Sequence, residues 1–234
     1  MPRPFARHYD AIYADKDYGA DVAAFESLAG AGAGRKLLEI GAGTGNHTLR
    51  LAARAGRLVS IEVDADFGEI LERKVAGAAT VFLGPLQRLE ESDFDAAAAF
   101  FHVLNYIRGD ELPSFLDALA ARLKPGAPFV TDLWNAAAVA TDPPRAVIRR
   151  KPRVVQEIFP VVDGRRVTLR YKVTVDGEAF EEQLVLHMWP MEELEAMLKK
   201  AGFRDVVFRD YRDCGAAATQ GSWKLWLRAV RGAW

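Results

Sequence analysis

Residues 36–51, KLLEIGAGTGNHTLRL, constrain the fold of this chain more than any other segment. An apolar run that contains the acid Glu39 leads into three glycines at alternate positions, Gly41, Gly43 and Gly45. The pattern predicts a strand, a tight turn and a helix, with backbone N–H groups at the helix start free to meet a ligand. A dinucleotide fingerprint, G-x-G-x-x-G, would carry its third glycine where Asn46 stands. The observed spacing is G-x-G-x-G, so the turn is predicted to hold a different ligand.

The segment that follows alternates between short apolar runs and amphipathic runs as far as residue 134. Strands are predicted at 36–40, 58–63, 80–83, 94–101 and 127–134, and two more, at 203–211 and 223–230, follow a helix at 191–201. This alternation implies an α/β fold with a doubly wound, mostly parallel seven-stranded sheet. In such sheets ligands bind at the carboxyl ends of the strands, near the switch point in strand order.

The pattern changes after Asn135. Residues 136–151 are predicted to form a loop, and three β-rich runs follow at 153–159, 165–175 and 178–189. Asp163-Gly164 and Asp176-Gly177 separate these runs and are strong hairpin signals. The chain is therefore divided into a helical N-terminal flap (1–35), an α/β core (36–135), a loop with an antiparallel β insert over the sheet's carboxyl edge (136–190), and a last helix with two strands (191–234).

Composition limits the partners and the surroundings of the protein. The 234 residues include 31 lysines and arginines against 32 acids, a net charge of −1, so no strong attraction to nucleic acid or membrane is expected. Cys214 is the single cysteine, which excludes an internal disulfide, and no His/Cys cluster has zinc spacing. No signal peptide or membrane-spanning run is recognised. We expect a cytoplasmic protein without a metal, a nucleic-acid partner or a membrane partner; whether it is a monomer or a homodimer stays open.

The acid before the glycines and the G-x-G-x-G spacing resemble the first motif of class I S-adenosylmethionine (SAM) methyltransferases. Three further segments resemble the second, fourth and fifth strand regions of that family, namely LVSIEVDADFGEIL, FDAAAAFFHVLNYI and LKPGAPFVTDLW. HYDAIYADKDYGAD, near the start, is similar to an opening found in small-molecule methyltransferases, including the N,N-dimethyltransferases of nucleotide-linked amino sugars. The resemblance implies a Rossmann-like methyltransferase fold, SAM as cofactor and S-adenosyl-L-homocysteine (SAH) as product.

The resemblance also implies which residues hold the cofactor. Glu39 is placed to accept from the SAM amino group, and Glu62, 21 residues after Gly41, to accept from the ribose hydroxyls. The full predicted set is Tyr13, Glu39, Gly41, Ala42, Gly43, Gly45, Glu62, Val63, Leu86 and Phe101. One departure concerns adenine, because Gly84-Pro85-Leu86 stands where the family often has a Gly-Asp pair. Adenine recognition would then rest on the N–H of Leu86 and on apolar packing.

Candidates for the acceptor side follow the fourth and fifth predicted strands. His102 is predicted as a proton-accepting or hydrogen-bonding group, and Asp132 as a group that orients the acceptor. The alternatives are a packed histidine satisfied by the backbone, and a solvated or backbone-bonded acid. Predicted acceptor contacts are Tyr9, Asn105, Trp134 and His187, with the β insert as the lid over the acceptor.

The leading hypothesis is a SAM-dependent methyltransferase that acts on an amine or hydroxyl of a small molecule, such as a sugar nucleotide or another metabolite. A nicotinamide-dependent oxidoreductase is the first alternative, and the glycine spacing and Glu39 argue against it. A non-catalytic SAM-binding module is the second, and Pro85 favours it mildly.

Overall fold

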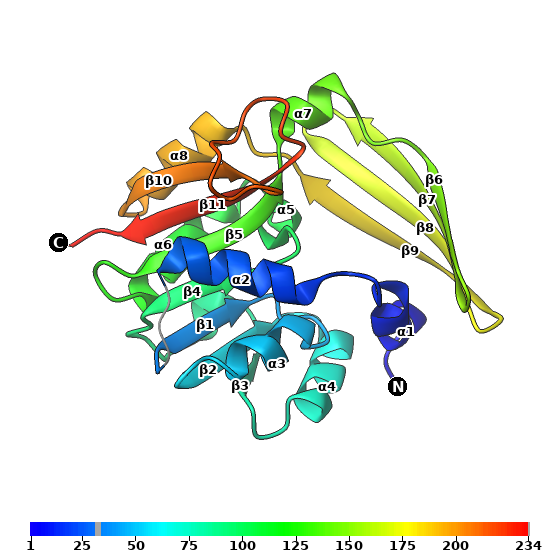
Figure 1. Cartoon of the computed structure of the whole chain (residues 1–234), viewed down its shortest axis with the longest axis horizontal. Helices are drawn as coiled ribbons and strands as arrows, with labels where there is room; N and C mark the ends of the chain where they lie inside the picture. Colours follow the sequence, from blue (N-terminus) through cyan, green and yellow to red (C-terminus); the bar gives the residue numbers. More distant parts are fainter. Residues whose placement is uncertain (31–33, 234) are drawn as a thin grey trace.

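Two β-sheets organise the chain in the computed structural model, which describes residues 1–30 and 34–233 (Figure 1). Residues 31–33 of the predicted N-terminal segment, and Trp234 of the last segment, lie outside the described residues. The larger sheet has seven strands in the order β10-β11-β5-β4-β1-β2-β3, and the smaller has four in the order β6-β7-β8-β9.

The seven-stranded sheet confirms the predicted doubly wound fold. Its strands are β1 (Lys36–Ile40), β2 (Arg57–Glu62), β3 (Thr80–Leu83), β4 (Ala96–Ala99), β5 (Pro128–Trp134), β10 (Phe203–Asp210) and β11 (Lys224–Arg231). Strands β1 to β5 are parallel, whereas β11 runs antiparallel to both β5 and β10. The strand order reverses at β1, between β2 and β4, so the glycine turn after β1 lies at the switch point.

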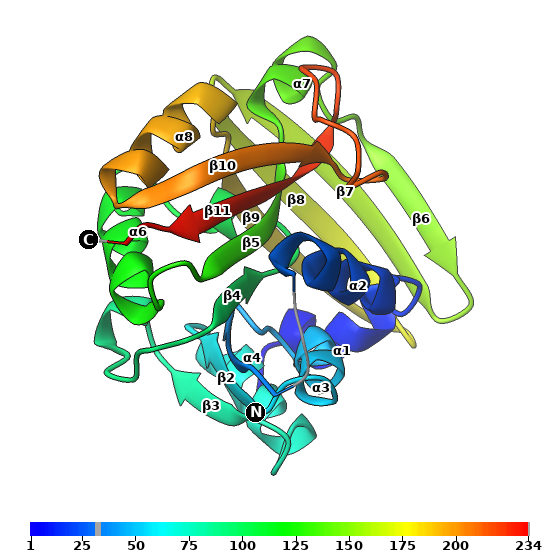
Figure 2. The ribbon, with the colours of Figure 1, turned by 60° about the vertical axis from the view of Figure 1, so that its left-hand side comes forward.

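Helices cover both faces of this sheet (Figure 2). They are α2 (Tyr18–Ala29), α3 (Asn46–Ala52), α4 (Ala65–Lys74), the short α5 (Val103–Tyr106), α6 (Leu112–Arg122) and α8 (Met191–Lys200), with a 3₁₀ turn, η1 (Leu86–Arg88). Alternate strand residues belong to different cores: Ala96 and Ala98 pack with Phe25 of α2, and Ala97 and Ala99 belong to the cluster of α6. Alanine, a poor strand former, therefore makes a central strand here because large helix side chains fill both faces.

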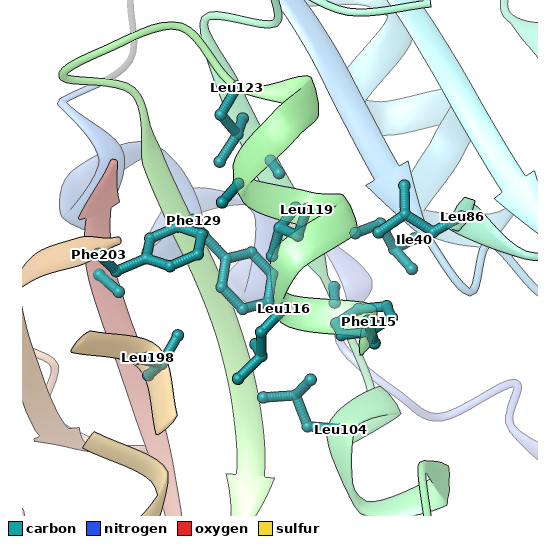
Figure 3. Packing of buried hydrophobic residues seen from close by; sticks show 14 of the residues in the cluster. Ile40, Leu86, Leu104, Phe115, Leu116, Leu119, Leu123, Phe129, Leu198 and Phe203 are labelled. Atoms are coloured by element: carbon teal, nitrogen blue, oxygen red, sulfur yellow. The ribbon is translucent and has the colours of Figure 1, made fainter. Parts of the chain in front are cut away.

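The apolar face of α6 shows how the sequence directs this packing. Phe115, Leu116 and Leu119 recur at helical spacing and are all buried. In Figure 3, Leu116 and Leu119 lie near Phe129 of β5, and Phe115 lies toward Ile40 and Leu86. Pro113 stands in the first turn of the helix, where its missing N–H costs no hydrogen bond.

The smaller sheet is the predicted antiparallel insert. It consists of β6 (Val147–Lys151), β7 (Val154–Asp163), β8 (Arg166–Val175) and β9 (Glu178–His187). Both predicted hairpins form. Asp176 and Gly177 both have positive φ, as a type I′ turn requires, whereas in the other hairpin only Gly164, the first of the two loop residues, has positive φ, at 55°.

The predicted loop at 136–151 is wrong at both of its ends. Residues Ala136–Thr141 form α7, whose first turn is capped by the Asn135 side chain accepting from the Ala137 N–H at 3.1 Å. Val147–Lys151 forms the edge strand β6, so the insert has four strands rather than three. Strand β6 was missed because only its backbone pairs regularly with β7, while its side chains lack apolar–polar alternation.

The N-terminal helix α1 (Pro4–Ile12) connects the core to the insert (Figure 1). Phe5 and Ile12 are buried in the apolar cluster of the insert. The Arg3 guanidinium contacts Asp64 and Asp66 at the start of α4 and Glu182 of β9, at 2.7, 3.0 and 3.1 Å. This helix therefore lies against both halves of the molecule at the carboxyl edge of the core sheet.

Candidate functional site

The three glycines of the turn differ in what they make room for. All have positive φ, 71° at Gly41, 59° at Gly43 and 88° at Gly45. A Cβ atom at Gly41 would lie 2.6 Å from Val103, and one at Gly45 would lie 2.8 Å from Val75, so these two glycines permit close internal packing. A Cβ atom at Gly43 would have no neighbour within 4 Å among the described residues. Gly43 is therefore the glycine that faces open space.

The backbone N–H groups of the turn are largely paired inside the protein. Gly41 and Ala42 both donate to the Ile61 carbonyl at 2.9 Å, and Gly45 donates to the Ala42 carbonyl at 3.0 Å. Ala42 is also buried against Leu71. These hydrogen bonds fix the turn against the end of β2, and they involve turn residues that precede the helix start at Asn46.

Glu62 lies beside this turn. Its Oε2 accepts from the Gly43 N–H at 2.7 Å, and its Oε1 accepts from the N–H groups of Val63 and Asp64, each at 2.9 Å. The side chain is 7% exposed, and burial raises its pKa while the three N–H groups oppose that rise. A carboxylate offers about four lone-pair positions, so after these three hydrogen bonds Glu62 can still accept from another donor. The Val63 side chain is 70% exposed.

Glu39 lies under the turn rather than in it. It is 1% exposed, and its Oε2 accepts from the hydroxyls of Thr48 at 2.6 Å and Ser60 at 2.7 Å. Burial raises the pKa of this carboxyl to about 7. The Oε2 atom thereby joins α3 to β2 beneath the turn.

Replacing this buried acid should stabilise the protein above neutral pH. The folded-state pKa of about 7 exceeds the reference value of 4.5, so the folded state holds the proton more tightly than the unfolded state does. The contribution of Glu39 to the free energy of unfolding therefore falls as pH rises from about 4.5 to about 7. For Glu39→Gln we expect a stability gain over the unmodified protein that grows across this range to at most about 3 kcal/mol.

Urea denaturation of both proteins between about pH 5 and about pH 8 measures this difference. Glu72→Gln, at an exposed position on α4, is the matched control and should show no such pH dependence. A Glu39→Gln difference that is constant with pH would contradict the raised pKa.

A second turn, after β4, holds two consecutive residues in the left-handed region. Phe101 has φ 65° and His102 has φ 54°, which is costly for side chains of this size. Asp132 of β5 holds them: its Oδ1 accepts from the Phe101 N–H at 2.5 Å, and its Oδ2 accepts from the His102 N–H at 3.0 Å. The Lys224 ammonium lies 2.8 Å from Asp132 Oδ2. Asp132 is 0% exposed, so it positions this turn and presents no free carboxylate to an acceptor.

His102 is the polar side chain of this turn. It is 7% exposed, and burial lowers its pKa to about 3, so the imidazole is neutral at physiological pH. Its Nε2 lies 3.4 Å from the Tyr106 hydroxyl. Its Nδ1 is buried and has no hydrogen-bond partner within the described part of the chain. A buried polar atom of this kind is expected to pair with something that binds there.

His102 lines a cavity of about 330 Å³ between the carboxyl edge of the core sheet and the inner face of the insert. This volume is at the lower end of the range for small-molecule sites, about 300–1,000 Å³. The walls are mainly aromatic and are formed by Tyr13, Phe101, Tyr106, Trp134, Tyr171 and Trp223. The cations at the cavity are Arg145, Arg149 and Lys224.

The predicted site residues divide into those at this cavity and those away from it. Tyr13, Phe101, His102 and Trp134 line it. Tyr9 does not; its ring packs edge-on against Phe67 of α4, on the side of the glycine turn. The Leu86 side chain is buried in the main core.

Asn105 and His187 also lie outside the cavity lining. Asn105 is fully buried, and its amide donates to the His187 carbonyl at 2.8 Å and accepts from the Trp134 N–H at 2.9 Å. It thereby ties β5 to β9. His187 pairs with Arg166 across β8 and β9, so its side chain lies on the opposite face of the insert sheet from Leu169 and Tyr171 of the cavity lining.

Sequence reasoning missed Lys224, Trp223, Arg149 and Tyr171 of the cavity lining. A signal existed for the first two. The last strand runs antiparallel to β5, and Lys224 pairs with Trp134, so the start of β11 meets the carboxyl end of β5. No comparable signal identified Arg149, because strand β6 itself was missed.

Across residues 1–30 and 34–233, no three His, Cys, Asp or Glu side chains are grouped so that they could hold a metal ion. Within the same ranges no helix combines the length and apolar character needed to cross a membrane.

Known proteins resemble this chain in sequence. Residues 37–126 match a family model described as a methyltransferase domain. The chain is 34% identical over 109 residues to ribosomal RNA small subunit methyltransferase A of Anaeromyxobacter sp. (strain K). The matched segment covers 42% of this chain and only 38% of that protein. It is 27% identical over 179 residues to dTDP-4-amino-2,3,4,6-tetradeoxy-D-glucose N,N-dimethyltransferase of Saccharopolyspora spinosa, covering 73% of this chain and 72% of that protein.

The fold is shared over the whole length with solved structures. An S-adenosylmethionine-dependent methyltransferase from Clostridium acetobutylicum superposes with a TM-score of 0.83, covering 98% of each chain at 18% identity. At this identity the likeness shows the fold, including the seven-stranded sheet.

Proposed function

We propose that this chain, which carries a methyltransferase domain at residues 37–126 and has the fold of SAM-dependent methyltransferases, transfers a methyl group from SAM to a small-molecule acceptor. One observation carries the proposal. The glycine turn leaves open space at Gly43, directly beside the Glu62 carboxylate and at the switch point of the sheet. The cavity lined by Phe101 and His102 adjoins the same edge and would take the acceptor.

The residues at the turn suit SAM with one exception. SAM supplies an electrophilic methyl group on a sulfonium. Gly43 permits close approach of the backbone to a ligand, and the unused capacity of Glu62 suits the two ribose hydroxyls. Glu39 is the exception, because its carboxyl is buried by Thr48 and Ser60. We assign it to the support of the turn rather than to the cofactor amino group.

The acceptor side favours nitrogen over oxygen. A hydroxyl acceptor needs a base that removes its proton, whereas a neutral amine attacks without one. The pKa of His102 is lowered to about 3, so its imidazole is a weak base. Its unpaired Nδ1 can still accept a hydrogen bond from an N–H group and orient the lone pair of the amine. We therefore propose N-methylation, with His102 as an orienting residue and the aromatic walls excluding water.

Calorimetric titration with SAM tests the cofactor half of this proposal. SAM is expected to bind, and NAD is not. Glu62→Gln should weaken SAM binding by about 10- to 100-fold, because a charge-assisted pair of hydrogen bonds is lost. Glu72→Gln, an exposed acid on the neighbouring helix, should bind SAM like the unmodified protein. Saturation by NAD without heat from SAM would refute the cofactor assignment.

A methyl-transfer assay tests the acceptor half. Mass spectrometry should detect a gain of one methyl group on small amines, including amino-sugar nucleotides, in the presence of SAM. Binding of SAM without turnover on any amine, alcohol or RNA would favour a non-catalytic module. Turnover on RNA alone would contradict a small-molecule acceptor.

A further inference from the structure

The charged groups at the acceptor cavity are all of one sign. Arg145, Arg149 and Lys224 line it, and no Asp or Glu is among the described residues that do. Two of these cations have acidic partners outside the lining. Lys224 pairs with the buried Asp132 at 2.8 Å, and Arg145 pairs with the exposed Asp142 at 3.0 Å.

Arg149 differs from the other two cations. No carboxylate lies within 4.0 Å of its guanidinium in the described part of the chain. Burial raises the pKa of the Tyr13 and Tyr171 hydroxyls above the ordinary range, and the positive charge of Arg149 opposes this rise in both. The guanidinium therefore lies near both hydroxyls. Both tyrosines line the same cavity. Asp15, whose pKa is lowered mainly by its pair with Lys151, also feels the charge of the exposed Arg149. The Arg149 guanidinium is thus a cation at the cavity without an ion pair of its own in the described part of the chain.

A second unpaired donor lies next to Arg149. Gln156 is its cross-strand partner, so the two side chains project from the same face of the insert sheet. Gln156 shares that face with Ile158, another residue of the cavity lining. Gln156 is 2% exposed, and its Nε2 makes no hydrogen bond of ordinary geometry among the described residues. The amide does lie near the Tyr13 hydroxyl, whose pKa it lowers against the effect of burial, so it faces the cavity that Tyr13 lines. A buried amide donor without a partner, beside a free guanidinium, is a site prepared for oxygen atoms that carry negative charge.

The cavity therefore has two unlike ends. At the core sheet, the unpaired His102 Nδ1 accepts from an N–H group in the tautomer in which Nε2–H faces the Tyr106 hydroxyl. At the insert, Arg149 and Gln156 are donors for an anion. We propose, resting on the methyl transfer proposed above, that the acceptor is a small anion whose carboxylate or phosphate group binds Arg149 and Gln156. The nitrogen to be methylated then lies at His102, and the aromatic walls hold the skeleton between the two ends.

The test uses simple probes on the full-length protein loaded with SAH. Benzoate and phenyl phosphate carry the two candidate anions on a flat ring, and benzamide is a neutral molecule of similar shape. We expect at least one of the anions to bind, as measured by calorimetry and by a rise in melting temperature, and benzamide to bind at least about tenfold more weakly. Preference for benzoate or for phenyl phosphate identifies the anion as a carboxylate or a phosphate.

The matched variants are Arg149→Gln and Arg150→Gln. Arg150 is the next residue on β6, is exposed, and lies on the opposite face of the sheet. Arg149→Gln should reduce anion binding about tenfold or more and leave SAH binding unchanged, and Arg150→Gln should change neither. Equal binding of benzamide, equal loss in both variants, or no anion binding by a protein that binds SAH would each overturn the inference. Failure of SAH and SAM to bind would instead refute the proposed function.

Discussion

Asp132→Ala should destabilise the protein by about 3–5 kcal/mol, the range for breaking a buried ion pair. The Asp132 side chain is fully buried and accepts from the N–H groups of Phe101 and His102. Its removal would leave both N–H groups unsatisfied and the Lys224 ammonium without its partner. The two left-handed residues would lose the contacts that hold them. Urea denaturation at neutral pH measures the loss.

Two further variants make this result interpretable. Asp142→Ala removes an exposed acid that pairs with Arg145 three residues on, and should cost no more than about 0.5 kcal/mol. Asp132→Asn keeps one acceptor oxygen, so its loss of stability should lie between those of Asp132→Ala and Asp142→Ala. A loss below about 1 kcal/mol for Asp132→Ala would show that the Phe101–His102 turn holds its conformation without this carboxylate.

Gly43→Ala should abolish most SAM binding while the fold survives. A methyl group at this position meets no described atom within 4 Å, so it enters the open space proposed for SAM. The left-handed backbone, with φ 59°, costs an alanine about 1–2 kcal/mol, which a stable domain tolerates. We expect SAM affinity to fall by at least about 100-fold, or ~2.7 kcal/mol, in a calorimetric titration.

Gly164→Ala is the control for backbone strain. Gly164 has φ 55° in a hairpin of the insert, and a Cβ atom there also has no neighbour within 4 Å among the described residues. The Gly164→Ala variant should lose about as much stability as Gly43→Ala and bind SAM normally. If Gly43→Ala also binds SAM normally, the cofactor does not lie against this turn.

Local sequence predicted the parts of the fold that local interactions determine. The three glycines predicted the turn after β1, and the two Asp-Gly pairs predicted both hairpins of the insert. Helix α6 followed from its apolar spacing. Strand β6 escaped prediction because its position depends on pairing with β7.

The site was less predictable because its key conformations depend on residues far away in the chain. The left-handed Phe101 and His102 are held by a carboxylate that follows some 30 residues later, which no local pattern shows. Asp132 and His102 were both identified as functional candidates from their positions at strand ends. The sequence did not predict that Asp132 holds the backbone of the His102 turn. Only the structure shows the carboxylate facing that backbone and the imidazole facing the cavity.

Helix α1 has a consequence for the kinetics of the site. At one end Arg3 joins α4 to the insert, and further along Asp10 bonds to Thr44 in the glycine turn at 2.6 Å and to Lys74 at 2.7 Å. Detachment of this helix would therefore break contacts with both halves of the molecule at once. Most of these contacts are partly exposed charge pairs, which added salt weakens. The dwell time of a bound molecule should therefore shorten as ionic strength rises, even where its own contacts are apolar.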